Sequence, residues 1–292
     1  MSAAGDLRLN PMSHNHNEHD DYGGLQRDLL ATGAAMDRRG ILRMAVRFGA
    51  GVGALQLLGC GGSSPTTPST NPNTGTVTPG TGTNSTCSTI PSETAGPYPG
   101  DSSNGPNVLN LTGVVRSDIR SSFAGLSGTA DGVPLSIVLS IVSASTCAPL
   151  AGYAVYLWHC DRPGRYSLYS AGATNQNYLR GVQEADSAGK VTFSSIFPGC
   201  YAGRWPHVHF EVYRSLAAAS SVSNKIATSQ IALPKSACDQ VYATSGYSSS
   251  VTNLSQVSLA SDNVFSDGSA LELATVSGSV SGGMTAALTV AV

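Results

Sequence analysis

The sequence is short of charge. Asp, Glu, Lys and Arg make up 12% of its 292 residues, and the net charge is −2, whereas soluble domains carry about 25% charged residues. With 41% hydrophobic residues, the chain is not a highly charged disordered protein, because such proteins contain few apolar residues. A net charge near zero also leaves no basic surface for nucleic acid. We therefore expect a folded protein with no nucleic-acid partner.

The sequence also lacks an apolar run long enough to span a membrane. The best candidate, residues 44–59, has about 16 residues and is interrupted by Arg47, whereas a spanning helix needs about 20. The pair Arg38 and Arg39 precedes this run, and the letters LLGC, ending at Cys60, close it. This order is typical of a twin-arginine export signal. Its end resembles a bacterial lipobox, in which Cys60 would be lipidated; a plain signal peptide with a chance cysteine is the alternative.

Residues 61–86 contain no charged residue and consist mostly of Gly, Ser, Thr, Pro and Asn. Such a segment buries too little apolar surface to offset the entropy of folding, so we expect a flexible tether. The chain then divides into a signal (1–60), the tether (61–86) and a folded domain (87–292). We expect this domain to be periplasmic, extracellular or anchored at the cell surface, with membrane contact only through Cys60.

Cysteines are few, and no two of them have C-x-x-C spacing. That absence argues against a zinc cluster. Cysteines of exported proteins commonly pair, and we expect two disulfides and one thiol among the five that follow the signal. The sequence does not fix which of them pair. The five are Cys87, Cys147, Cys160, Cys200 and Cys238.

The domain does contain a series of short apolar, β-branched runs separated by Gly, Pro and Ser. Many short strands with turns between them are typical of a β-sandwich or a β-barrel. Helix is expected only at residues 215–223 and 239–244. We therefore predict an all-β domain with few short helices. The predicted strands are residues 135–142, 154–159, 191–197, 208–212, 271–276 and 284–292.

Histidine is scarce in the domain, which contains only His159, His207 and His209. Two of them alternate with apolar residues in WPHVHFEV (205–212). Alternate residues of a strand face the same side, so His207 and His209 would point together while the apolar residues between and after them enter the core. Two imidazoles on one strand supply half of a metal site. The alternative is a pair of surface histidines on an edge strand.

Two further segments add phenols to these imidazoles. WHCDRPGRY (158–166) ends on Tyr166, and FPGCYAGR (197–204) carries Tyr201 and Arg204 just before the histidines. A phenol with a pKa near 10 binds as phenolate only when a strong Lewis acid stabilises the anion, which favours ferric iron. A zinc or copper site built on the two histidines is disfavoured, because phenolates are poor ligands for either metal.

In these motifs the sequence resembles the intradiol ring-cleavage dioxygenases, the family of the catechol and protocatechuate dioxygenases, and especially its exported members. The resemblance spans roughly residues 91–230 and is strongest over 154–212. It implies an antiparallel β-sandwich that holds one mononuclear non-haem Fe(III), with O2 as co-substrate. The ligands that it implies are Tyr166, Tyr201, His207 and His209.

The resemblance also implies roles for residues around the iron. Arg204 would contact the substrate and stabilise charge, and Tyr201 would leave the metal to take a substrate proton. Gln230 resembles a glutamine that lines the family's pocket. Tyr98, in ETAGPYP (93–99), would reach the pocket mouth; a turn leading into a strand is the competing interpretation. The substrate would be a small aromatic diol, opened by O2 to a cis,cis-muconate-type diacid.

A second hypothesis keeps the scaffold without the reaction: a non-catalytic β-sandwich at the cell surface that binds a metal or another ligand. Retention of both tyrosines, both histidines and Arg204 favours the dioxygenase, because a binding module needs none of that arrangement. Trp158 and Trp205 are expected to be packing residues, and Arg180 and Asp186 to be structural. The sequence sets neither the particular catechol nor the oligomeric state.

Overall fold

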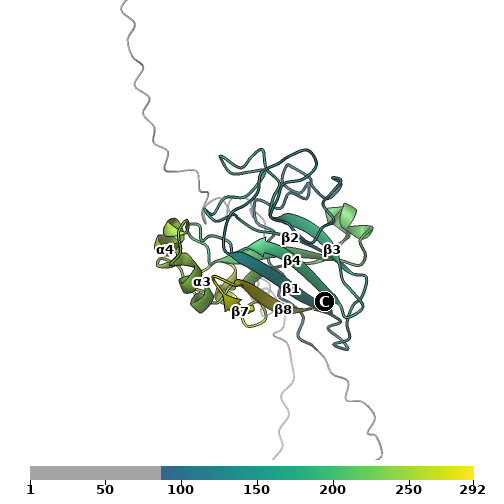
Figure 1. The fold of residues 1–292 in the computed structure, drawn as a ribbon. Helices are drawn as coiled ribbons and strands as arrows, with labels where there is room; N and C mark the ends of the chain where they lie inside the picture. Colours follow the sequence, from purple (N-terminus) through teal and green to yellow (C-terminus); the bar gives the residue numbers. More distant parts are fainter. Residues whose placement is uncertain (1–86) are drawn as a thin grey trace, which may run out of the picture. The chain divides into compact units, whose positions relative to one another are not determined.

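The computed structural model describes residues 87–292, which form two four-stranded sheets packed as a sandwich (Figure 1). The expected export signal and tether, residues 1–60 and 61–86, lie outside the described residues. Within the described part, no helix has the length and apolar character that a membrane span requires. The all-β architecture with few short helices confirms the fold class predicted from the sequence.

The first sheet has the strand order β4-β1-β8-β7. Alternate residues of β1 are buried, as expected for a strand with one face against a core. β1 and β8 run parallel, whereas the other neighbours are antiparallel. Among the named strands, the sandwich is thus antiparallel except at this one pair. The strands are β1 (Pro134–Val142), β4 (Lys190–Ile196), β7 (Thr275–Ser279) and β8 (Gly283–Ala291).

The second sheet has the order β3-β2-β5-β6 and is antiparallel throughout. Strand β5 pairs with a neighbour on each side, so the two histidines of the H-x-H motif lie on an inner strand. This placement excludes the edge-strand alternative for the motif. The strands are β2 (Ala154–Trp158), β3 (Arg180–Glu184), β5 (His207–Tyr213) and β6 (Lys225–Ala232).

The hydrophobic core lies between the sheets. Leu139 of β1, Phe193 of β4 and Phe210 of β5 are fully buried in one apolar cluster. All seven residues of β5 are buried, although only alternate ones face this core, because loops cover the other face of the second sheet. A second apolar cluster on that face includes Trp158 and Tyr166. The tyrosine-bearing loops therefore lie over the same face that carries the histidines.

Short helices connect the strands after β6. Figure 1 places α3 (Lys235–Tyr242) and α4 (Ser248–Leu254) together at one end of the sandwich. The helix expected at 239–244 thus begins earlier and ends at Tyr242. The helix expected at 215–223 is instead two single 3-10 turns, at Ala218–Ser220 and Val222–Asn224.

Three strand predictions need correction. β3 is not among the predicted strands, since RGVQE is polar and lacks an apolar alternation, yet its residues pair with β2 along their whole length. β6 was missed because KIATSQIA mixes polar and small residues. The strand expected at 271–276 begins only at Thr275, since the preceding residues form a turn with a single bridge between Ala232 and Leu273.

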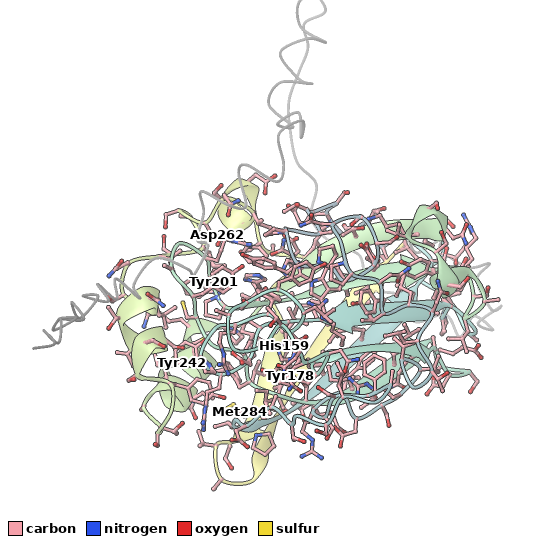
Figure 2. All side chains as sticks on the ribbon, turned by 90° about the horizontal axis from the view of Figure 1, so that it is seen from above. His159, Tyr178, Tyr201, Tyr242, Asp262 and Met284 are labelled. Carbon is pink, nitrogen blue, oxygen red and sulfur yellow. A yellow bond between two sulfur atoms is a disulfide. The ribbon has the colours of Figure 1, made fainter. Side chains whose placement is uncertain are left out.

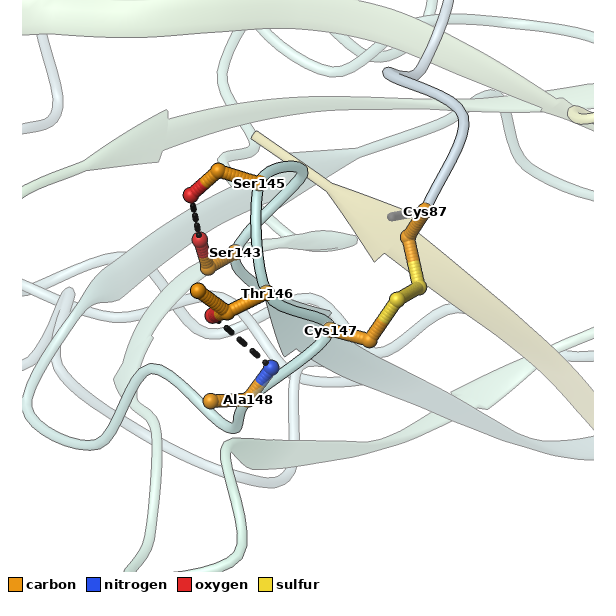
Figure 3. Close-up of a disulfide and its surroundings, with 6 residues drawn as sticks. All are labelled: Cys87, Ser143, Ser145, Thr146, Cys147 and Ala148. Carbon is orange, nitrogen blue, oxygen red and sulfur yellow. Dashed lines mark hydrogen bonds between the residues drawn. A yellow bond between two sulfur atoms is a disulfide. The ribbon is translucent and has the colours of Figure 1, made fainter. Parts of the chain in front are cut away.

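The described residues contain one disulfide, Cys87–Cys147 (Figure 3), where two were expected. The other three cysteines, Cys160, Cys200 and Cys238, are buried thiols. Cys160 Sγ donates to the Gly199 carbonyl, and Cys200 Sγ to the Arg204 carbonyl, both at 3.4 Å. These thiols pack as small core residues. The spacing of cysteines along the chain does not predict which of them will be buried thiols.

Candidate metal centre

The two histidines of β5 converge at the middle of the second sheet. His209 lies opposite Trp158 of β2 and opposite Gln230 of β6. The Nε2 atoms of His207 and His209 are 3.1 Å apart, and each side chain is 2% exposed. As the alternation predicted, Val208 enters the core between the sheets.

Tyr166 reaches the histidines from the loop that follows β2. Asp161 folds this loop, because its Oδ1 accepts from the Arg165 N–H at 2.8 Å and its carbonyl accepts from the Gly164 N–H at 2.9 Å. Gly164 has φ +92°, and a Cβ on it would lie 3.1 Å from Tyr201 Cβ. Glycine at this position therefore lets the two tyrosine loops approach each other.

Tyr201 is carried by the loop between β4 and β5. Its carbonyl accepts from the Arg204 N–H at 3.4 Å, and Gly203, the third residue of this four-residue turn, has φ +81°. A turn of this kind needs glycine at its third position. The turn presents Tyr201 and Arg204 just before β5, next to the histidines.

Four donor atoms meet at this point. Tyr166 Oη lies 3.2 Å from both His207 Nε2 and His209 Nε2, and Tyr201 Oη lies 3.3 Å from His207 Nε2. Ligands bound about 2 Å from one metal ion are about 3 Å from one another. The spacing of the four donors therefore fits a single small metal ion.

The surroundings of the two imidazole rings support this arrangement. His207 Nδ1 donates to the Trp205 carbonyl, which leaves the Nε2 lone pair directed at the other donors, as metal-binding histidines require. The His209 ring stacks on Trp158, with centroids 5.0 Å apart and planes 5° from parallel. A Cβ on Gly96 would lie 3.3 Å from His209 Cε1. The His209 ring is thus held between an indole and a backbone that approaches closely.

Burial sets the protonation of the cluster. Desolvation, and then the positive charge of Arg204, lower the pKa of His207 well below its ordinary value; desolvation does the same for His209, mainly with His207 as the second cause. Both imidazoles are therefore neutral, the form that binds metals. Desolvation raises the pKa of Tyr166 well above 10. Its phenol keeps its proton unless a strong Lewis acid stabilises the phenolate.

Residues 87–292 contain no group of three or more His, Cys, Asp or Glu side chains placed to hold a metal. The candidate centre depends on its two tyrosines to complete the donor set. This donor set, two imidazoles and two phenols, fits Fe(III) better than the softer divalent metals. The four predicted ligands are brought together, and their binding of iron stays a prediction.

Arg204 lies beside the four donors and is fully buried. Its Nε donates to Asp262 Oδ2 at 3.0 Å, and its Nη2 donates to Gln230 Oε1 at 2.7 Å. Gln230 Nε2 in turn donates to the Thr94 carbonyl at 2.9 Å. Gln230, predicted as a pocket residue, therefore orients the arginine and ties the N-terminal segment to β6.

The sequence did not point to Asp262. It lies in an irregular stretch after α4 with no motif around it, and it is 0% exposed. Only the fold brings it to Arg204, across 58 positions of the chain. A buried arginine in a predicted site does require an acidic partner, but the sequence offers no means of choosing which one.

Tyr98 packs at the edge of the cluster. Its ring centroid lies 4.9 Å from that of Tyr166 and 5.3 Å from that of Tyr169. Arg180 is buried and donates from Nη2 to the Tyr98 carbonyl at 2.9 Å, which is the structural role expected of it. Trp205 is also a packing residue, with Nε1 donating to the Leu233 carbonyl at 2.8 Å.

The fold and the site together define a class of protein: a β-sandwich with a buried cluster of two tyrosines and two histidines under the loops of one sheet. The family model described as Dioxygenase matches residues 103–217, a range that contains all four donors and Arg204. No curated protein sequence matches the chain.

Comparison with solved structures identifies the fold more closely. An intradiol ring-cleavage dioxygenase from Tetranychus urticae matches with a TM-score of 0.57 and 24% identity, over 70% of this chain and 94% of that one. A second dioxygenase structure matches with a TM-score of 0.56 and 24% identity, over the same shares of the two chains. A catechol 1,2-dioxygenase from Pseudomonas arvilla C-1 is less similar, with a TM-score of 0.40 and 21% identity over 69% and 60%. The chain has the intradiol dioxygenase fold, and the resemblance to that family is confirmed.

Proposed function

We propose that this protein is a non-haem Fe(III) intradiol dioxygenase that opens a catechol-type aromatic diol with O2. The observation that carries the proposal is the convergence of four donors beside the buried Arg204. Each of the four has at least one other donor atom within 3.1–3.3 Å. The donors belong to Tyr166, Tyr201, His207 and His209. The overall reaction is balanced without a further reductant: one diol and one O2 give one cis,cis-muconate-type diacid that contains both oxygen atoms.

The four side chains would hold the metal as two phenolates and two neutral imidazoles. Ferric iron, when bound, supplies the Lewis acidity that keeps both phenols deprotonated and makes a bound catecholate reactive toward O2. All four ligands are at most 6% exposed. This burial excludes bulk water and strengthens the electrostatic interactions inside the site.

Tyr201 and Arg204 would act on the substrate directly. Both tyrosines are carried by loops, whereas His207 and His209 lie on a paired strand, so a tyrosine can move at lower cost than a histidine. The family resemblance assigns that movement to Tyr201. Its phenolate oxygen would accept a proton from one catechol hydroxyl. The Arg204 guanidinium, held by Asp262 and Gln230, would stabilise the negative charge that develops on the substrate.

Gln230 and Tyr98 would complete the substrate pocket. The Gln230 amide reaches Arg204 from β6, and the Tyr98 ring packs on Tyr166. An aromatic diol placed beside the cluster would contact a phenol face on one side and polar groups on the other. This is the usual character of a small-molecule site, with mostly apolar walls and a few fixed polar groups.

The first test is spectroscopic. Purified full-length protein loaded with ferric iron is expected to be coloured by phenolate-to-iron charge transfer and to change colour when catechol is added without oxygen. With oxygen, it is expected to consume O2 in the presence of catechol, protocatechuate, hydroxyquinol or larger aryl catechols. Protein that stays colourless after iron loading would exclude this function and favour the non-catalytic binding protein.

A pair of tyrosine variants tests the site assignment. Tyr201→Phe is expected to lower kcat at least about 100-fold, because it removes both a ligand and a proton acceptor. Tyr213→Phe is the matched control: Tyr213 is also a buried tyrosine, on β5, and its hydroxyl donates to Glu211 at 2.7 Å, away from the donor cluster. Equal turnover in the two variants would contradict the assignment.

We also propose that the protein acts outside the cytoplasm, as a lipid-anchored or released enzyme. The Cys87–Cys147 disulfide supports this, because stable disulfides belong to oxidising compartments. The lipobox-like Cys60 would supply the only membrane contact. Radiolabelled-lipid incorporation that is lost in Cys60→Ser is the expected result.

A further inference from the structure

We infer that Asp262 is the positioning residue that sets the orientation of Arg204 in the active site. The inference rests on the proposed function, since Arg204 acts on the substrate only if the reaction does. Asp262 lies outside the residues that the dioxygenase family model matches, 103–217, and outside every motif of the sequence.

Asp262 and Arg204 are in direct contact and are shielded from solvent. Asp262 Oδ2 accepts from Arg204 Nε at 3.0 Å, and the two side chains are 0% and 1% exposed. A charge-assisted hydrogen bond removed from water in this way is strong. Loss of one partner leaves the other charge buried without compensation.

The same oxygen also fixes the backbone that leads to the ligands. Asp262 Oδ2 accepts from the Trp205 N–H at 2.7 Å, and the Trp205 carbonyl accepts from His207 Nδ1. One carboxylate oxygen thus accepts from the Arg204 side chain and from the backbone N–H of Trp205, which lies between Arg204 and His207 in the chain. Rotation of the Arg204 side chain relative to the ligand strand would break one of these bonds.

The second carboxylate oxygen makes the support rigid. Asp262 Oδ1 accepts from the Val264 N–H at 2.8 Å and the Phe265 N–H at 3.2 Å, so the carboxylate is bound to its own loop as well as to Arg204. Asp262 and Tyr201, both labelled in Figure 2, are linked through Arg204, whose N–H donates to the Tyr201 carbonyl and whose Nε donates to Asp262.

Among residues 87–292, Asp262 at Nε and Gln230 at Nη2 hold the guanidinium group in place. Within residues 87–292, the hydrogen bonds of Asp262 go to Arg204, Trp205, Val264 and Phe265 and to none of the four donors. Its effect on the reaction would therefore pass through Arg204, which is what distinguishes a positioning residue from a catalytic one.

Asp262→Asn is the variant that tests this role. It keeps the size of the side chain and an acceptor for the loop N–H groups, while it replaces the charged oxygen that faces Arg204. We expect kcat to fall about 10–100-fold, the usual effect of removing a supporting hydrogen bond, with iron content and the visible band of the resting protein retained. Asp239→Asn is the control, since Asp239 is a surface carboxylate paired with Lys235 on α3, and it is expected to leave kcat unchanged.

A double-mutant cycle with Arg204→Gln separates positioning from a general structural role. If Asp262 acts through Arg204, Asp262→Asn lowers kcat/KM less than about threefold once Arg204 has been replaced, because coupled residues are not additive. A full 10–100-fold loss in that background, or unchanged turnover in the single variant, would overturn the inference. Loss of iron from the single variant would also overturn it, since that result assigns Asp262 to the ligand framework.

The experiments distinguish failure of the proposed dioxygenase function from failure of the positioning role of Asp262. Wild-type protein that binds no iron, or binds it without turning over any catechol, removes the proposed function and the positioning role with it. Active wild-type protein with an equally active Asp262→Asn variant removes only the positioning role. If Asp262→Asn does not fold, as judged by circular dichroism, Asp262→Ser takes its place in the same comparison, because its hydroxyl still accepts from the loop N–H groups.

Discussion

The contacts of Nε2 distinguish the structural histidine from the candidate ligands. His159 is as buried as His207, but both of its nitrogens are bonded: Nδ1 donates to the Cys160 carbonyl at 2.7 Å and Nε2 accepts from Ser195 Oγ at 2.6 Å. In His207, only Nδ1 is used by the backbone, and Nε2 faces phenol oxygens. The candidate ligands are therefore the two buried histidines whose Nε2 atoms face phenol oxygens, His207 and His209.

The stability of the domain should respond to the protonation of His159. Desolvation lowers the pKa of His159 from 6.5 to about 4, so between these values the unfolded chain binds a proton that the folded chain does not. Stability linked to His159 is complete above pH 6.5 and is lost as the pH falls to about 4, by about 3 kcal/mol in total.

Denaturant unfolding of wild type and His159→Gln between pH 7 and pH 4 measures this effect. The variant is expected to be less stable than wild type at pH 7, because it loses the paired contacts of the imidazole. The difference is expected to shrink as the pH falls, since only the wild type loses the contribution of His159. A difference that stays constant across this range would show that His159 titrates normally.

At the scale of elements, the site is built from one strand and two loops. The sequence predicted the strand well, because the alternation of WPHVHFEV has only one arrangement that buries its apolar residues. It also predicted the four donors, since their order along the chain matches a known family. It did not predict β3, because the five residues RGVQE have no apolar alternation and are extended through their pairing with β2. Nor did it predict the contact of Asp262 with Arg204, because the two residues are 58 positions apart and no local sequence pattern connects them.

The two tyrosine loops depend on a glycine at their point of contact. Gly164→Ala adds a methyl group 3.1 Å from Tyr201 Cβ at a position with φ +92°. We expect it to cost about 1–3 kcal/mol of stability from backbone strain and, in addition, to weaken iron retention by displacing Tyr201.

Gly105→Ala is the matched control for this variant. Gly105 has φ +87°, and a Cβ there would meet nothing within 4 Å, so the same backbone strain arises without a clash near the ligands. Both variants are expected to lower the melting temperature, and only Gly164→Ala to lower the iron content after dialysis. Equal iron content in the two would show that Tyr201 tolerates the added methyl group.

At the scale of the whole molecule, the disulfide and the site lie at opposite ends of β2. Cys147 precedes this strand, whereas Trp158, its last residue, stacks on His209. Cys87 marks the start of the described domain, and its N–H donates to the Ala144 carbonyl at 2.9 Å. The bond thus ties the first residues of the sandwich to the loop after β1 (Figure 3).

This separation predicts that the disulfide affects stability and leaves the chemistry unchanged. A cross-link that closes 60 residues restricts the unfolded chain, and its loss costs about 2–4 kcal/mol. Replacing both Cys87 and Cys147 by Ser in the full chain is expected to lower the free energy of unfolding by this amount, with kcat and the visible band unchanged at temperatures where the variant is folded. Unfolding in denaturant, followed by far-UV circular dichroism, measures the first quantity, and O2 uptake with catechol the second. A fall in kcat at full folding would contradict the separation, because it would mean that the bond transmits strain along β2 to the stacked His209.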